Sequence, residues 1–251
     1  MASRTAATDS PPAAPRAKRP AASAEAIAAA LTTAIVEHRL APGTQLKERA
    51  LGEIFGCSRT LIREALIQLA RIKLVTMREN AGAFVATPTV DEAHQVFGVR
   101  RMLEVQLLRE WIPKSTAAEV KRLRAHLASE KEALVRSDIA LRTRLLGDFH
   151  VVVAQMSRND VLVDLTRELV ARSSLILLVY QSWQSANHSS DEHQGLVDAI
   201  AHKKLDHAIE LAEEHLRHVE HNVFLNPRRP LADLNEALRP SPTASPKRSP
   251  S

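Results

Sequence analysis

The sequence predicts a mainly α-helical protein, in which a small N-terminal domain of three helices and one β-hairpin precedes an all-α bundle of six to seven helices. Three observations favour this fold class. Hydrophobic residues make up 45% of the 251 residues, but aromatic residues only 3%, which is typical of helical proteins. Apolar residues recur at three- and four-residue intervals over most of the chain. Only one stretch, residues 74–87, has the pattern of two short strands joined by a turn.

Composition and turn signals divide the chain into four segments. Residues 1–21, rich in Pro, Ala, Ser and Arg, are expected to be a disordered basic arm, and residues 226–251 a disordered tail. A polar break at Ala86-Thr87-Pro88-Thr89 separates the two folded parts. We therefore expect a first domain over residues 22–87 and an all-helical second domain over residues 88–225.

Three helices are predicted in the first domain. The first runs from Ser23 to Leu40 and is stopped by Pro42-Gly43. The second runs from Lys47 to Phe55 and is broken at Gly56-Cys57, where a residue able to adopt positive φ is useful. The third, from Arg59 to Ile72, carries one apolar stripe that predicts a buried face.

That stripe leaves Arg59, Thr60 and Arg63 together on the exposed start of the third helix, with Ser58 as its expected N-cap. A helix that follows a short glycine turn and exposes basic and hydroxyl side chains is suited to the major groove of DNA. Arginine there can bind phosphates or guanine. The alternative is that these arginines are solvated helix charges, as a lone arginine usually is.

The second domain is expected to contain only helices, joined by short polar loops. A nearly continuous apolar run, SLILLVY, predicts one central core helix. A polar loop, SANHSSD (residues 185–191), is expected before the last two helices. The predicted helices are Val90 to Ile112, Thr116 to Arg136, Ile139 to Met156, Val161 to Trp183, Asp191 to His202 and Leu205 to Phe224.

The charge distribution differs between the two domains. Within a net charge of +5, residues 1–88 hold 12 basic and 7 acidic residues, whereas residues 89–225 hold 17 and 20. Positive charge on the first domain is what the neutralisation of phosphates requires. No apolar run approaches the roughly 20 residues of a membrane helix. The single cysteine, Cys57, excludes an internal disulfide framework. We therefore expect a cytoplasmic protein that binds no membrane.

A series of short motifs runs in order through the first domain: Pro42-Gly43, Leu46, Glu48-Arg49-Ala50-Leu51, Gly56-Cys57-Ser58-Arg59, Arg63-Glu64-Ala65-Leu66 and Gly82. With these motifs the domain resembles the winged helix-turn-helix of GntR-family bacterial transcription regulators. The resemblance implies that Arg49, Arg59 and Arg63 contact operator DNA and that Gly82, in the hairpin wing, approaches the minor groove. Ser58 and Thr60 join this predicted DNA-binding set.

The second domain contains the landmarks Arg100-x-x-Leu103-Glu104, Phe149-His150, Asn159, Glu192-His193 and His215-Leu216. They are sparser than the motifs of the first domain. In their order and spacing they resemble the FCD effector domain found in the GntR subfamily typified by the fatty-acid regulator FadR.

Three histidines, His150, His193 and His215, lie on the apolar sides of three different predicted helices. Neutral imidazoles on facing helices are how bundles build zinc or nickel sites. In metal-binding FCD domains an Asp four residues before the first His completes the set, and here Leu146 stands there. Asp148 is about 200° around the helix from His150 and should point away. The alternatives are a three-histidine metal site or a metal-free pocket that binds an anion.

The expected function is ligand-responsive transcription regulation, most simply as a homodimeric repressor that binds double-stranded operator DNA. A small anionic metabolite would bind the helical domain, with Arg100 as the natural anchor of its carboxylate and Arg172 as a second candidate. Arg100 can also pair with Glu104 one turn away. The alternatives are an effector-independent architectural DNA-binding dimer and a metal-dependent hydrolase, although the sequence contains no HExxH motif. We expect no enzymatic activity.

Overall fold

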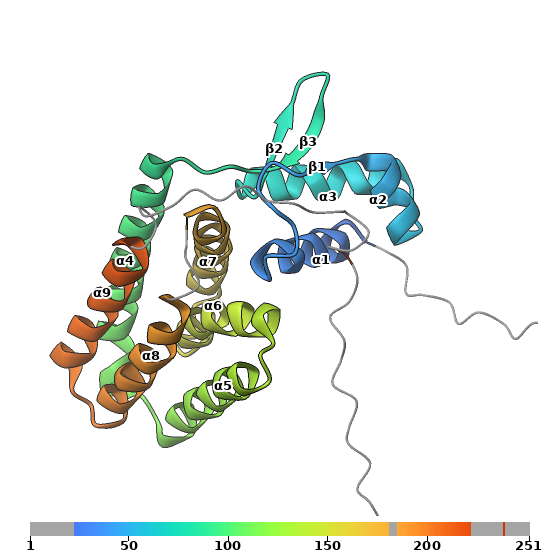
Figure 1. Cartoon of the computed structure of the whole chain (residues 1–251). Coiled ribbons are helices and arrows are strands. Elements are labelled where there is room, and N and C mark those ends of the chain that lie inside the picture. Colours follow the sequence, from blue (N-terminus) through green and yellow to red (C-terminus); the bar gives the residue numbers. More distant parts are fainter. Residues whose placement is uncertain (1–22, 181–184, 222–237, 239–251) are drawn as a thin grey trace, which may run out of the picture.

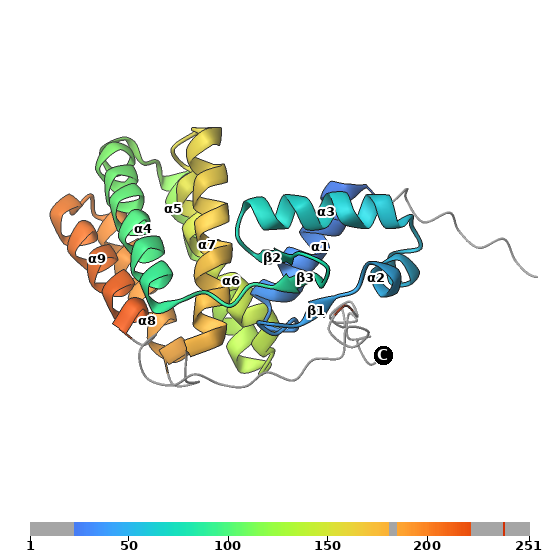
Figure 2. The same ribbon diagram turned by 90° about the horizontal axis from the view of Figure 1, so that it is seen from above.

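The computed structural model describes residues 23–180, 185–221 and 238. Within them, a small domain with a protruding β-hairpin lies beside a helical bundle (Figures 1 and 2). The predicted arm and most of the predicted tail lie outside the described residues. In chain order the elements are α1 (Ala24–Val36), β1 (Gln45–Leu46), α2 (Glu48–Phe55), α3 (Arg59–Arg71), β2 (Val75–Arg78), β3 (Gly82–Val85), α4 (Val90–Trp111), the 3-10 turn η1 (Ile112–Lys114), α5 (Ala117–Val135), α6 (Ile139–Gln155), α7 (Asp160–Tyr180), α8 (Ser185–Ala201) and α9 (Leu205–His221).

The predicted fold class is confirmed: α1 to α3 and a small sheet precede six bundle helices in the described part of the chain. The first helix is shorter than predicted, because it ends at Val36 rather than Leu40. After it, His38 adopts a left-handed conformation with φ of 58°. The chain then folds back so that the amide of Leu40 donates to the carbonyl oxygen of Ala34 (2.9 Å), which places the Leu40 side chain in the core.

The helix-turn-helix forms as predicted. Gly56 follows α2 with φ of 65°, a conformation that glycine adopts without steric cost. Ser58 caps α3, and its Oγ accepts a hydrogen bond from the amide of Leu61 (3.3 Å). The apolar stripe of α3 is buried mainly against α1, which fixes the direction in which the opposite face of α3 points. Cys57 is partly buried against the same core.

The wing contains one strand more than predicted. β2 and β3 form the expected antiparallel hairpin, and β1 pairs antiparallel with the other edge of β3. Thr76 of β2 and Gln45 of β1 both face Phe84 in this register. A strand of two residues leaves too short a pattern to be predicted from its own sequence. Figure 1 shows the β2–β3 hairpin extending away from the helices.

The bundle packs α4 along α9 and α7, and α5 between α6 and α8. Helices α4 and α5 both begin with a capping box, Thr89 with Glu92 and Thr116 with Glu119. The predicted loop over residues 185–191 is wrong, because these residues form the start of α8. The prediction took these polar residues to be exposed to solvent. In the structure, the hydroxyl of Ser190 instead donates to the buried carboxylate of Glu130 (3.1 Å).

The remaining predicted helix ends differ from the structure by a few residues. Helix α7 ends at Tyr180, and the predicted residues 181–183 lie outside the described part. Helix α9 is described to His221, and the predicted residues 222–224 lie outside the described part. Helix α7 also joins the two domains, because Ala171 and Leu175 pack into the core of the first domain. None of the helices in residues 23–180 and 185–221 is long and apolar enough to cross a membrane.

Candidate effector site and DNA-binding surface

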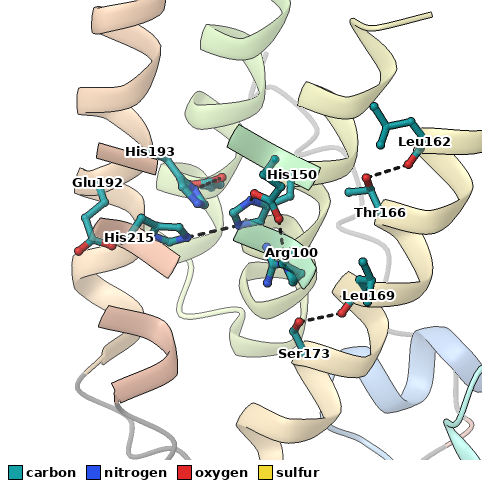
Figure 3. Close-up of polar contacts among 11 residues, drawn as sticks. Arg100, His150, Leu162, Thr166, Leu169, Ser173, Glu192, His193 and His215 are labelled. Atoms are coloured by element: carbon teal, nitrogen blue, oxygen red, sulfur yellow. Dashed lines mark hydrogen bonds and ion pairs between the residues drawn. The ribbon is translucent and has the colours of Figure 1, made fainter. Parts of the chain in front are cut away.

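The three predicted histidines meet inside the bundle. His150 comes from α6, His193 from α8 and His215 from α9, and each side chain is buried. One ring nitrogen from each lies within 4.8 Å of those of the other two. Figure 3 shows the rings pointing toward one another, with Arg100 of α4 beside His150. Four of the bundle helices, α4, α6, α8 and α9, therefore contribute to one buried polar site.

Each histidine is oriented by a carboxylate on its Nδ1 side. A carboxylate that is ionised only accepts hydrogen bonds, so each Nδ1 carries the proton and each Nε2 keeps its lone pair. Carboxylates in this position are the usual partners of metal-binding histidines. The pairs are His150 with Glu104 (2.8 Å), His193 with Glu130 (3.2 Å) and His215 with Glu192 (2.6 Å).

The three Nε2 atoms have an electrostatic arrangement that fits a cation. Those of His150 and His215 lie 3.3 Å apart, although neither carries a proton when its Nδ1 does. The Nε2 of His193 is buried and has no hydrogen-bond partner among the described residues. Lone pairs that face one another in a low-dielectric interior repel, and a divalent cation between them would remove that repulsion.

Burial sets the protonation of this cluster. It lowers the pKa of His150 to about 3 and that of His193 to about 4, so both rings are neutral near pH 7. Burial alone would raise the pKa of Glu104, but the neighbouring Arg100 guanidinium outweighs it and holds this pKa well below its usual range. Burial likewise opposes ionisation of Glu130, yet hydrogen bonds from His126 and His193 lower its pKa to about 2. The site combines neutral ligands with charged carboxylates behind them.

No carboxylate takes part among the ligand atoms that the described residues bring together. Leu146, one turn before His150, lines the adjacent cavity. Asp148 lies elsewhere, with Oδ2 3.9 Å from Nε of Arg144, as its place on the helix predicts. Three imidazoles therefore leave at least one coordination position for a water molecule or for an oxygen atom of a ligand.

A cavity of about 460 Å³ opens beside the histidines. It lies among α4, α6, α7, α8 and α9, and its far wall is formed by residues that follow α1. Arg100 reaches this cavity with a side chain only 5% exposed. Its Nε donates to Glu104 (2.8 Å), as the spacing predicts, whereas its Nη2 is buried and has no hydrogen-bond partner in the part of the chain that the structure describes. The Nη2 of Arg100 can thus donate to a ligand in the cavity.

Arg172, the second predicted effector anchor, does not join this cavity. It lines a separate pocket of about 80 Å³, together with Lys73, Thr87 and Glu92, where α7 meets the first domain. The next residues of α7, Ser173 and Ser174, face the main cavity instead. Successive residues of a helix point in directions 100° apart. Arg172 therefore faces a different side of α7 from the serines, although it is next to them in sequence.

The predicted DNA-binding residues are exposed in the first domain: Arg49 on α2, Arg59, Thr60 and Arg63 at the start of α3, Ser58 before it and Gly82 in the wing. The Arg49 side chain is 79% exposed and pairs with Glu53 (3.0 Å). Gly82 has φ of 89°, which favours glycine.

The sequence did not single out Arg78, which lies opposite Gly82 in the hairpin register and places its guanidinium 4.4 Å from the Phe84 ring centre. It adds a cation to the wing.

Other residues of the effector site were also missed. The partner of His193, Glu130, has no prominent motif, but it lies three residues after Leu127 and seven after Leu123, on the apolar stripe of α5. An acidic residue on such a stripe requires a buried partner, and this signal was available in the sequence. Glu37 and His38, which form the far wall of the cavity, carried no comparable signal.

Comparisons with known proteins identify a known family profile for each of the two domains. Residues 23–85 match the profile of the bacterial regulatory proteins of the gntR family, and residues 95–218 match that of the FCD domain. The chain is 28% identical over 194 residues to the Uxu operon regulator of Haemophilus influenzae, covering 70% of this chain and 72% of the relative. It is also 28% identical over 209 residues to the galactonate operon transcriptional repressor of Escherichia coli, covering 71% and 86%.

Solved structures show the same fold. A GntR regulator from Rhodococcus sp. RHA1 superposes with a TM-score of 0.73 at 22% identity, over 80% of this chain and 96% of that one. Escherichia coli McbR/YncC superposes with a TM-score of 0.69 at 18% identity, over 77% and 93%. The two profile matches follow one another along the chain and correspond to its two domains. The protein therefore belongs to the GntR family of bacterial transcription regulators, with an FCD domain as its C-terminal part.

Proposed function

We propose that the protein is a homodimeric repressor whose affinity for operator DNA is controlled by a small carboxylate-bearing metabolite. The metabolite binds in the cavity beside His150, His193 and His215. The observation that carries this proposal is the coincidence, in one enclosed space, of an unpaired buried donor on Arg100 and three converging imidazoles. An anion bound there would supply the acceptor that Arg100 lacks, and a divalent cation held by the imidazole lone pairs would supply positive charge to attract it.

The start of α3 reads the operator. Arg59, Thr60 and Arg63 are exposed there, and the packing of α3 on α1 holds them on the outer face. In a helix-turn-helix, residues at the start of the second helix contact base edges while neighbouring cations bind phosphates. Arg49 on α2 and the wing around Gly82 supply further contacts to the DNA backbone and minor groove. A homodimer would present two such surfaces to a palindromic site.

A divalent transition metal, zinc or nickel, would be held by the Nε2 atoms of His150, His193 and His215. The donor set suits both ions, since each accepts imidazole ligands. When bound, the ion supplies positive charge and an open position for an oxygen of the metabolite. The carboxylates of Glu104, Glu130 and Glu192 hold the rings in the required orientation. Leu146 contributes no ligand atom, so the oxygen comes from the metabolite or from water.

The names of two relatives guide the choice of metabolite. One relative is a repressor of a galactonate operon, and galactonate is a hydroxylated carboxylate. Another relative carries the name of a Uxu operon regulator, so both names indicate regulation of an operon. Carboxylates of this size fit the cavity of about 460 Å³.

Two measurements on the full-length protein test the proposal. The first is fluorescence anisotropy with duplex from the region upstream of its own gene and with a scrambled duplex, at moderate salt. We expect clear preference for the upstream duplex. The second is thermal unfolding with a panel of carboxylates, with and without chelator. A ligand at 100 times its Kd stabilises the protein by about 2.7 kcal/mol.

The same measurements separate the alternatives. Preference for the upstream duplex without stabilisation by any carboxylate indicates an architectural DNA-binding dimer. Hydrolytic turnover of a metabolite by metal-loaded protein indicates a hydrolase. The proposal fails if neither duplex preference nor ligand stabilisation is observed.

A further inference from the structure

A second pocket lies between the two domains, apart from the effector cavity. Its volume is about 80 Å³, and it shares no lining residue with the cavity beside the histidines. The first domain contributes Lys73, two residues after the end of α3, and the bundle contributes Arg172 of α7 and Glu92 of α4. The linker between β3 and α4 also lines the pocket, and Figure 2 shows it crossing from the first domain to the bundle. The pocket therefore exists because the two domains meet.

Two cationic side chains of this pocket are unpaired in the described part of the chain. Neither Lys73 nor Arg172 forms a hydrogen bond or an ion pair through its side chain within residues 23–180, 185–221 and 238. Arg172 is half-buried, and the apolar side chains of Leu175 and Ile176 line the same pocket. A guanidinium has five N–H donors and no acceptor, so an anion supplies both the opposing charge and the acceptors that it lacks.

Lys73 has a backbone conformation that favours glycine. Its φ is 63°, in the left-handed region. It follows the C-cap residue Ile72, and the amide of Leu74 donates to the carbonyl oxygen of Leu69 (3.0 Å), as in a Schellman motif. Glycine is the usual residue at this position, because it adopts the conformation without steric cost. The turn itself therefore gives no reason for a lysine, whereas an anion in the pocket does.

Glu92 adds one carboxylate to the pocket. Its Oε2 accepts hydrogen bonds from the amide (2.9 Å) and the hydroxyl (3.4 Å) of Thr89, in the capping box of α4. Its Oε1 accepts none from the residues that the structure describes. An ionised carboxylate repels a fully deprotonated anion, but it accepts a hydrogen bond from an anion that still carries a proton. The pocket therefore suits an oxyanion that has both acceptor oxygens and a hydroxyl group.

Inorganic phosphate meets these requirements. Near neutral pH every phosphate ion keeps at least one hydroxyl group, whereas sulfate keeps none. A water molecule takes about 30 Å³ in the liquid, so a pocket of about 80 Å³ has room for one small tetrahedral ion. Thr76 and Thr87, which also line the pocket, offer further hydroxyl donors.

We propose that this interdomain pocket binds inorganic phosphate, with Lys73 and Arg172 donating to its oxygens and Glu92 accepting a hydrogen bond from its hydroxyl group. The inference is independent of the proposed function, because no residue of the effector cavity takes part. Phosphate bound here contacts both domains, through Lys73 beside the recognition helix and through Arg172 in the bundle. It therefore stabilises the domain arrangement in which these two cations lie close together.

The test compares three anions by isothermal titration of the full-length protein at pH 7 and constant ionic strength. They are phosphate, sulfate and glycerol 3-phosphate, whose phosphoryl group is mostly without a proton at this pH. We expect phosphate to bind about tenfold more tightly than sulfate, because sulfate leaves Oε1 of Glu92 without a donor. Tighter binding of glycerol 3-phosphate than of phosphate would overturn the assignment of the free ion.

Three variants locate the binding site. Arg172→Gln removes the guanidinium charge and should weaken phosphate binding about tenfold, whereas Lys73→Gly suits the backbone and should weaken it about threefold, since Lys73 is exposed. Glu92→Gln keeps the capping box and should equalise the affinities for phosphate and sulfate, because an amide can donate to either ion. Arg71→Ala removes one exposed positive charge at the end of α3, outside the pocket, and is the matched control.

The possible results lead to different conclusions. Unchanged phosphate binding in folded Lys73→Gly and Arg172→Gln proteins places any bound phosphate elsewhere and overturns the site. If Arg172→Gln folds poorly, Lys73→Gly decides, since it relieves a backbone conformation that disfavours lysine. Equal affinities of the wild type for phosphate and sulfate overturn the selection of a protonated anion by Glu92. Absence of binding by all three anions overturns the whole inference and leaves the proposed function unaffected.

Discussion

Arg100 and His150 share a single carboxylate, that of Glu104. One oxygen accepts from Nε of Arg100 (2.8 Å) and the other from Nδ1 of His150 (2.8 Å). The residue expected to bind the effector and a residue expected to bind a metal are therefore held by the same group. Ionised Glu104 balances the buried guanidinium and at the same time fixes the tautomer of the imidazole.

Replacing this shared carboxylate tests both roles. Glu104→Gln removes the negative charge, so Arg100 becomes a buried cation without a counterion. We expect the free energy of unfolding to fall by about 3 to 5 kcal/mol, and the affinity for zinc to fall by about 10- to 100-fold. Urea denaturation and competition with a zinc chelator measure these quantities. Glu110→Gln, an exposed residue of the same helix, is the control. Unchanged zinc affinity in a folded Glu104→Gln protein would remove the metal-orienting role.

Removing one metal ligand should make the protein insensitive to chelation. His193→Gln keeps a side chain of similar reach but deletes the buried Nε2 atom, for which the described residues offer no hydrogen-bond partner. We expect a chelator to lower the Tm of the metal-loaded wild type and to leave the Tm of His193→Gln unchanged, because a bound ion stabilises only the folded state. His202→Gln should behave like the wild type. Equal chelator effects on all three proteins would place any bound metal elsewhere.

The start of α3 should determine sequence preference. Arg59→Ala removes an exposed side chain at the first position of the helix, without altering the packed face of α3. If Arg59 contacts a base, we expect a loss of about 1 to 3 kcal/mol in operator binding and relaxed discrimination at one operator position. Anisotropy titrations with single-base operator variants measure this effect. Arg71→Ala, at the exposed end of the same helix, is the control. Equal losses on operator and scrambled duplex would make Arg59 a phosphate contact.

The elements that were predicted correctly are those whose signals are local. The turn at Gly56, the cap at Ser58 and the stripe of α3 all lie within a few residues of one another, so the helix-turn-helix follows from sequence alone. The meeting of His150, His193 and His215 was also predicted, because each lies on an apolar face and such faces must pack together.

Features that depend on distant partners were not predicted. The start of α8 was taken for a loop, since nothing near Ser190 indicates that a carboxylate on α5 buries its hydroxyl. The carboxylate partners of the histidines lie 46, 63 and 23 residues away in sequence. The cavity wall at His38 depends on how α1 packs against α7, which spans the boundary between the domains.

His38 should make the stability depend on pH. Because burial lowers its pKa in the folded protein to about 4 from an ordinary value of 6.5, the unfolded chain binds more protons between these values. The free energy of unfolding is therefore highest above pH 6.5 and decreases as the pH falls toward 4. Relative to high pH, protonation of His38 in the unfolded chain lowers the free energy of unfolding by about 2 kcal/mol at pH 5 and by close to zero at pH 7.

The comparison uses His38→Asn, because asparagine accepts the left-handed backbone and does not titrate in this range. Urea denaturation of metal-free wild type and variant at pH 7, 6 and 5 measures the two pH slopes. His150 and His193 are present in both proteins, so their contributions cancel in the difference. We expect the variant to lose less stability on acidification than the wild type, and parallel slopes would show that His38 is protonated as readily in the folded protein as in the unfolded chain.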